Sequence, residues 1–172
     1  MRLVENDIQT FTVAIADADQ GRRLELERLL KGEIGIDLLS DGGTNDSDNG
    51  LASPRRKPRS RSEVTAYEKE VARIKFLKPF VLVVSLNQCN DEGYAFLLLL
   101  RHACPDARMI LLIDNSIDES HIINILQIGA RGYLNYENAR FHLPTAIKAV
   151  GHGEAWVPRK MLGSIVKHIL KK

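Results

Sequence analysis

Short apolar runs alternate with stretches of helical periodicity along most of the chain. The runs are rich in Val, Ile and Leu and are bounded by polar or turn residues, which is typical of strands buried on both faces of a sheet. They predict strands at Thr12–Ala16, Ile34–Leu39, Phe80–Ser85, Met109–Ile113 and Arg131–Leu134. Apolar residues three and four positions apart predict helices at Gln20–Lys31, Ser62 or Glu63 to Leu77, Tyr94–Ala103, Asp118–Ile128, Phe141–Gly151 and Leu162–Leu170.

This alternation of strands and helices predicts an α/β fold. Successive strands joined by a helix are parallel, since a parallel pair needs a long crossover connection. Right-handed crossovers place helices on both faces, so we expect a doubly wound, five-stranded parallel sheet. In such sheets the functional side chains gather at the carboxyl ends of the strands.

One segment, Ser40–Ser62, has neither pattern. It holds one large apolar residue, Leu51, and is rich in Gly, Asp, Ser and Arg. Such a segment buries too little apolar surface to offset the entropy of ordering it, so we expect a flexible insertion. Its basic residues either contact nucleic acid or an acidic protein surface, or are solvated and keep the protein soluble. They are Arg55, Arg56, Lys57, Arg59 and Arg61.

Composition changes this picture little. The 172 residues carry a net charge of +2, with 44% hydrophobic and 27% charged residues, which suits one soluble domain with a short tail. The charge is too small to argue for nucleic acid or a membrane, and the longest apolar run is far short of a bilayer span. Cys89 and Cys104 show no metal-ligand spacing, and the N-terminus lacks an apolar signal core. We therefore expect a reduced, cytoplasmic protein without metal or cofactor.

Four segments carry a resemblance to a known family. They are KPFVLVVSLNQCNDEG, CPDARMILLID, GARGYLNYENARFHLPTAIKAVGHGEAWVP and, more weakly, VAIADADQGRR. Together they resemble the receiver domain of bacterial two-component response regulators of the NarL/LuxR type, over about Phe11–Pro158 apart from the insertion. The resemblance implies a flavodoxin-like, CheY-like fold. It implies an N-terminal arm over residues 1–10, the receiver over 11–158 with its insertion over 40–62, and a linker helix over 159–172.

The resemblance also implies a chemistry, which is phosphoryl transfer to an aspartate. The family uses an acidic pair that binds Mg²⁺, an acceptor aspartate, a hydroxyl and a lysine. These five positions fall here on Asp17, Ala18, Ser85, Ile113 and Tyr136. Asp17 alone keeps its chemistry. We therefore expect a degenerate receiver (a pseudo-receiver) that forms no acyl phosphate, binds Mg²⁺ weakly or not at all, and is not an enzyme.

Three side chains near these positions leave alternatives open. Ser85 fills the space of the missing aspartate or accepts phosphate from a serine kinase, and the first is favoured. Tyr136 reaches into the vacated pocket or points outward to solvent. Tyr133 keeps the family's aromatic position in the fifth strand, where it acts as a rotamer switch or packs as a core side chain.

An excess of apolar residues predicts an interface. The helix at Asp118–Ile128 carries more isoleucine and leucine than one buried stripe needs. Burial against a second copy and burial in the core remain alternatives for this surplus. The residues expected to form a dimer face are Ile122, Ile125, Leu126 and Ile147.

Two functional hypotheses follow. The first is a phosphorylation-independent receiver that regulates transcription through dimerisation. A helix-turn-helix output domain, expected beyond Lys172 and absent from this chain, would make the DNA contacts. The alternative is a stand-alone adaptor that binds a partner protein, or a small ligand in the vacated acidic pocket. The sequence downstream of Lys172 would separate them, and neither hypothesis involves a membrane.

Overall fold

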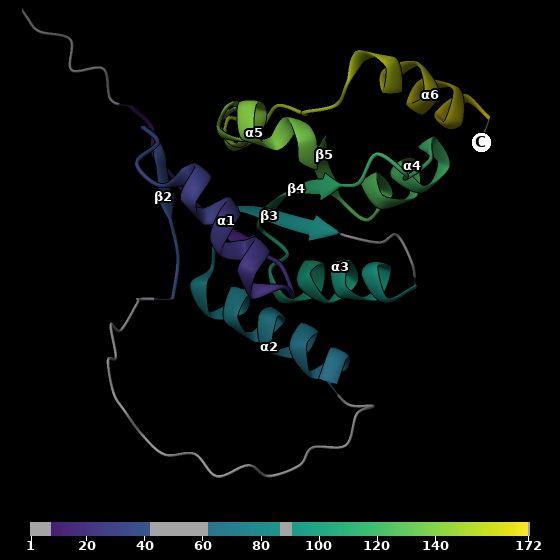
Figure 1. The fold of residues 1–172 in the computed structure, drawn as a ribbon. Coiled ribbons are helices and arrows are strands. Elements are labelled where there is room, and N and C mark those ends of the chain that lie inside the picture. The colour runs from purple at the N-terminus through teal and green to yellow at the C-terminus, as the bar shows by residue number, and fades with distance from the viewer. Residues whose placement is uncertain (1–7, 42–61, 87–90, 172) are drawn as a thin grey trace, which may run out of the picture.

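A single parallel sheet organises the chain. The computed structural model describes residues 8–41, 62–86 and 91–171. Its five parallel strands have the order β2-β1-β3-β4-β5, which confirms the predicted doubly wound α/β fold (Figure 1). The strands are β1 Phe11–Ala16, β2 Ile36–Leu38, β3 Val81–Leu86, β4 Arg108–Ile113 and β5 Ala130–Asn135. The helices are α1 Gln20–Leu30, α2 Ser62–Leu77, α3 Asp91–Ala103, α4 Glu119–Gln127, α5 Tyr136–Gly151 and α6 Arg159–Leu170.

Two apolar clusters cover the two faces of the sheet. Alternate residues of a strand point to opposite faces, so in β3 Val81 and Val83 join one cluster while Leu82 and Val84 join the other. α1 and α5 pack on the first face, and α2, α3 and α4 pack on the second. Because both faces are covered, β3 and β4 are almost uninterrupted apolar runs, as the sequence predicts.

α5 begins earlier than expected. The pattern predicts a helix from Phe141, but α5 begins at Tyr136 and continues through Pro144. A start at Phe141 would place Pro144 close to the helix N-terminus, where proline is tolerated better than in the helix interior. The structure instead extends the helix through Glu137 and Ala139, which are good helix formers. Tyr136 therefore follows β5 directly. α3 and α6 also begin three residues before their expected starts.

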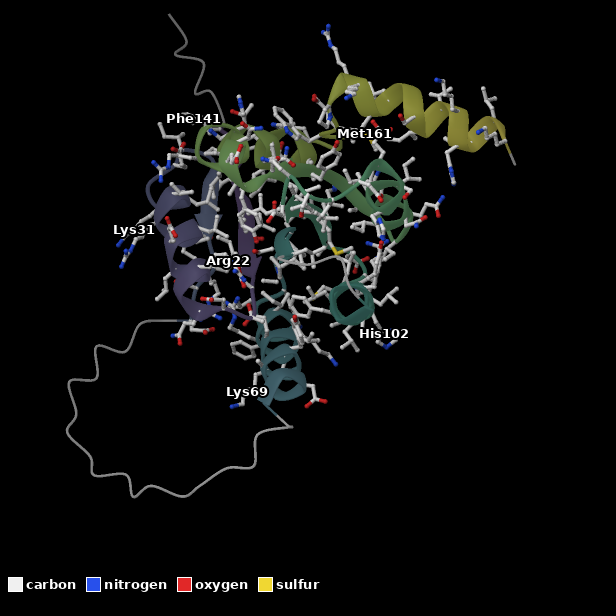
Figure 2. The ribbon with its side chains drawn as sticks, turned by 45° about the vertical axis from the view of Figure 1, so that its right-hand side comes forward. Arg22, Lys31, Lys69, His102, Phe141 and Met161 are labelled. Atoms are coloured by element: carbon white, nitrogen blue, oxygen red, sulfur yellow. The ribbon has the colours of Figure 1, made fainter. Side chains whose placement is uncertain are left out.

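The segment between α5 and α6, residues 152–158, returns to the sheet at β5 (Figure 1). We call it the exit segment. The Tyr133 N–H donates to the carbonyl oxygen of Trp156, and the Trp156 N–H donates to that of Arg131, both at 3.0 Å. Gly132 lies between these bonds, and a Cβ there would come within 2.3 Å of the Trp156 oxygen. The exit segment carries α6 onto α4, and Met161 at the start of α6 is buried (Figure 2).

The residues predicted as a dimer face lie on both sides of the sheet. Ile122 and Ile125 of α4 are buried in the cluster beneath α2, α3 and α4, whereas Ile147 of α5 is buried in the opposite cluster. Leu126 is half-buried. Ile122, Ile125 and Ile147 are therefore core side chains, which is one of the two alternatives. A side chain that is enclosed by its own chain offers no surface to a partner.

Two other expectations concern the predicted insertion and the membrane. Residues 42–61, with the five basic residues of the predicted insertion, lie outside the described ranges. In the ranges that are described, no helix combines the length and the apolarity that a bilayer crossing requires.

Candidate functional site

The carboxyl edge of the sheet brings the predicted site positions together. Asp17 directly follows β1, Ser85 lies near the end of β3 and Ile113 ends β4, and all three are buried. Tyr136 opens α5 and is half-buried against the cluster beneath α1 and α5. Ala18 is exposed. The five positions share one edge because all the strands run parallel.

An ion pair dominates this edge. The Nε of Arg22 lies 2.5 Å from Oδ2 of Asp17, and its Nη2 lies 2.6 Å from Oδ1. The Asp17 side chain is 1% exposed and that of Arg22 is 28% exposed. Two parallel hydrogen bonds between a guanidinium and a carboxylate are strong and directional. The hydrogen bonds and charge of Asp17 raise the pKa of Arg22 above its ordinary value, although desolvation opposes the shift.

The start of α1 explains how Arg22 reaches Asp17. Asp19 caps the helix by accepting the Arg22 backbone N–H at 3.0 Å, and this hydrogen bond lowers the pKa of Asp19. The Asp19 N–H in turn donates to Oδ1 of Asp17 at 2.8 Å. Arg22 therefore stands in the first turn of α1, and Figure 2 shows it on the side of the helix that faces the sheet. Both oxygens of Asp17 are engaged by its own chain.

A second charged cluster lies beside the first. Glu70 of α2 accepts the Asp17 backbone N–H at 3.2 Å on Oε1. Arg73 donates to Oε1 at 2.6 Å and to Oε2 at 3.0 Å, and Arg23 donates to Oε2 at 2.9 Å. Arg73 also donates to the carbonyl oxygen of Ile15. Burial lowers the pKa of Arg73, but the hydrogen bonds and charge of Glu70 outweigh it and the net direction is upward. This cluster ties α1 and α2 to the end of β1.

Glu70 was not predicted from the sequence, although the sequence contains a signal for it. Glu70 lies three residues after Tyr67 and four before Ile74, and both of these contribute to the apolar stripe of the helix. A carboxylate on such a stripe must be paired when it is buried. Two arginines, Arg23 and Arg73, supply that pairing from different helices. A charged residue at a position of the apolar stripe was therefore the signal for a buried, paired carboxylate.

Tyr136 and Tyr133 lie on different sides of β5. Burial is the main cause that raises the pKa of Tyr136, and the negative charges of Asp17 and Asp114 add to it. Tyr136 is therefore a neutral phenol close to the ion pair. Tyr133 is buried in the cluster on the α4 side, where burial and the charge of Glu119 raise its pKa.

The chemistry open to this edge is limited. The Ser85 hydroxyl is buried and makes no hydrogen bond with any described residue. Within the described ranges, no group of three or more His, Cys, Asp or Glu side chains is placed to hold a metal ion. The edge thus presents a paired carboxylate, a paired guanidinium, a neutral phenol and a lone hydroxyl.

Sequence comparison points to bacterial response regulators. No family model matches the sequence. The chain is 26% identical over 163 residues, or 95% of its length, to the transcriptional regulatory protein DegU of Brevibacillus brevis. It spans 58% and 48% of the length of the first curated relatives it matches, or about half.

Solved structures share the fold. A LuxR-family two-component response regulator from Aurantimonas sp. SI85-9A1 has a TM-score of 0.65 and 14% identity, covering 94% of this chain and 99% of that one. The isolated REC domain of RcsB from Salmonella enterica serovar Typhimurium has a TM-score of 0.64 and 16% identity, covering 95% and 100%. Another structure holds two RcsB dimers bound to two parallel DNAs. The chain thus has the fold of these receiver domains, and its sequence is similar to that of a transcriptional regulatory protein.

Proposed function

We propose that this receiver domain acts by binding, in a state that does not depend on phosphorylation of an aspartate. The main support for the proposal is the bidentate ion pair between Arg22 and Asp17. A cation supplied by the chain itself engages the carboxylate that the resembled family uses for Mg²⁺. This edge of the sheet is therefore held by a contact that needs neither a metal ion nor a phosphoryl group.

The residues at this edge do not fit Mg²⁺. The ion prefers several oxygen ligands in near-octahedral geometry. Both oxygens of Asp17 accept hydrogen bonds from Arg22, and one also accepts from Asp19. Ala18 offers no ligand, and a guanidinium beside the carboxylate repels a divalent cation. No step of the proposed function uses a metal.

The acceptor position does not fit phosphoryl transfer either. A serine hydroxyl becomes a nucleophile when an adjacent base takes its proton. Ser85 is 5% exposed, and its hydroxyl has no hydrogen-bond partner among the described residues. This supports Ser85 as a small residue in place of an acceptor, and it supports a protein that is not an enzyme.

Acetyl phosphate tests the proposal directly. The wild-type chain, incubated with acetyl phosphate and Mg²⁺, should show no mass increase of one phosphoryl group. A positive control is Ala18→Asp/Arg22→Ala/Ser85→Asp, which restores a free acidic pair and an acceptor carboxylate and should give a product that hydroxylamine removes. A stoichiometric, hydroxylamine-labile product on the wild type would overturn the proposal.

For the complete protein, we propose transcription regulation as a cytoplasmic dimer with a DNA-binding output domain. The support is the similarity to DegU, a transcriptional regulatory protein, and to RcsB, whose dimers have been seen on DNA. Sedimentation of this chain at micromolar concentration should show a dimer, with or without acetyl phosphate. A monomer under both conditions would count against dimerisation through this domain.

A stand-alone adaptor is the alternative proposal. A small ligand in the acidic pocket would have to displace Arg22 from Asp17. The ion pair therefore disfavours an adaptor that binds a small ligand there. A partner protein on the outer surface remains compatible with the structure. The gene sequence after Lys172 separates the two proposals, because only the regulator requires a helix-turn-helix domain there.

A further inference from the structure

A groove lies at the end of β5, away from Asp17 and Arg22. Its volume is about 620 Å³, which is within the range of sites for small organic ligands. The end of β5, the first two turns of α5, the exit segment and the first residue of α6 form its walls. The lining includes Asn135, Asn138, His142, Trp156, Pro158 and Arg159.

The wall formed by the exit segment is fixed to the sheet. Hydrogen bonds from Tyr133 and to Arg131 hold the Trp156 backbone on the edge of β5. Trp156 is half-buried and packs against the cluster beneath α1 and α5. Asn138 and His142 are four residues apart and therefore lie on one face of α5. The groove is thus formed by regular elements and a pinned segment.

The polar chemistry of the groove favours an anion. Arg159 gives a permanent positive charge, and no residue of the lining carries a carboxylate side chain. The Asn135 side chain makes no capping hydrogen bond at the start of α5. Amide, imidazole and guanidinium groups can all donate to a carboxylate, sulfonate or phosphate oxygen.

The aromatic and apolar lining favours a flat ring next to that charge. Trp156, Val157 and Pro158 line the groove together with Leu134. An indole presents a large apolar surface on which a ring can stack. We propose that this groove binds a small organic molecule that combines a flat ring with one anionic group. The groove is distinct from the candidate phosphorylation site, since none of Asp17, Ala18, Ser85, Ile113 and Tyr136 lines it.

The dye 1-anilinonaphthalene-8-sulfonate has this chemistry and can serve as the probe. Trp156 is the only tryptophan of the chain, so energy transfer from tryptophan to the dye reports binding to the domain, and the Arg159 variant tests whether the groove is the site. Titration of the full chain should give saturable transfer with one site. Arg159→Gln should weaken binding about tenfold, because one charge-assisted contact is worth roughly that much.

Lys160→Gln is the matched control. Lys160 is the next residue of α6, is exposed and does not line the groove. This variant should bind the dye as the wild type does, and both variants should keep the wild-type circular dichroism. The uncharged analogue N-phenyl-1-naphthylamine should bind wild type and Arg159→Gln alike.

Three results would overturn the proposal. One is dye binding that Arg159→Gln leaves unchanged, which would place the dye elsewhere, for example on the exposed side of α6 that carries Leu162, Val166 and Ile169. Another is equal weakening in Arg159→Gln and Lys160→Gln, which would reveal a general charge effect. The third is the absence of saturable binding up to millimolar dye.

Discussion

The Glu70 carboxylate accepts the backbone N–H of Asp17 at 3.2 Å and so joins α2 to the end of β1. The two residues are 53 positions apart in the sequence. The same carboxylate forms ion pairs with Arg23 and Arg73, whose side chains are 14% and 10% exposed. One side chain therefore pairs with two nearly buried cations and accepts one buried backbone N–H.

Glu70→Ala should strongly destabilise the domain. Removing one partner of a buried ion pair leaves an uncompensated charge and costs about 3–5 kcal/mol. Urea unfolding, followed by circular dichroism, measures this loss. Glu68→Ala, on the exposed side of the same helix, should change the free energy of unfolding by less than about 0.5 kcal/mol. Equal losses in the two variants would show that Glu70 has no special role.

Arg22→Ala should also destabilise the domain, but less. Asp17 would stay buried without its cation, while Arg22 itself is partly exposed, so we expect a loss of about 2 kcal/mol. Arg28→Ala, an exposed arginine of the same helix, is the control and should be near neutral. In the double variant Asp17→Asn/Arg22→Ala the loss should be smaller than the sum of the two single losses. Additive losses would contradict a direct coupling.

Gly132→Ala should displace the exit segment. A methyl group at this position meets the Trp156 carbonyl oxygen, and relief requires the two strands of backbone to separate. We expect a loss of about 1–3 kcal/mol and a red shift of the tryptophan emission. Gly163→Ala in α6 has nothing within 4 Å of its new methyl group and should stabilise slightly. An unchanged emission spectrum in Gly132→Ala would contradict this account.

The phenol of Tyr136 gives a prediction at alkaline pH. Burial and nearby carboxylates raise the pKa of Tyr136 in the folded state, whereas an unfolded tyrosine ionises near pH 10, its pKa being about 10. Above that pH the unfolded state loses a proton that the folded state keeps, so the free energy of unfolding falls. The urea midpoint should therefore drop from pH 9 to pH 11, and Tyr136→Phe should drop less. Tyr133 acts in the same direction and is present in both proteins. An identical drop in both would exclude Tyr136 as the cause.

The sheet was predictable because its information is local. β3 and β4 are buried on both faces, so each appears in the sequence as an apolar run with few alternatives. Helix starts were less predictable. The pattern predicts α5 from Phe141, whereas the helix begins at Tyr136 and tolerates Pro144 in its interior.

The candidate site was predictable only in part. Parallel topology brings Asp17, Ser85 and Ile113 to one edge, and the sequence shows that. The partner of Asp17 depends instead on the direction in which Arg22 leaves the first turn of α1, and the role of Glu70 depends on the packing of α2 against β1. Such contacts arise from tertiary structure, and periodicity alone does not contain them.

The exit segment has a consequence for how copies of the domain can associate. An uncovered strand at the side of a sheet offers its N–H and C=O groups to another chain. The Trp156 backbone forms hydrogen bonds with the N–H of Tyr133 and the C=O of Arg131 in β5. At this point, around Gly132, the sheet therefore cannot be continued by a second molecule. Any assembly on this side must therefore form through helix surfaces, whose side chains can be altered one at a time without changing the register of the sheet.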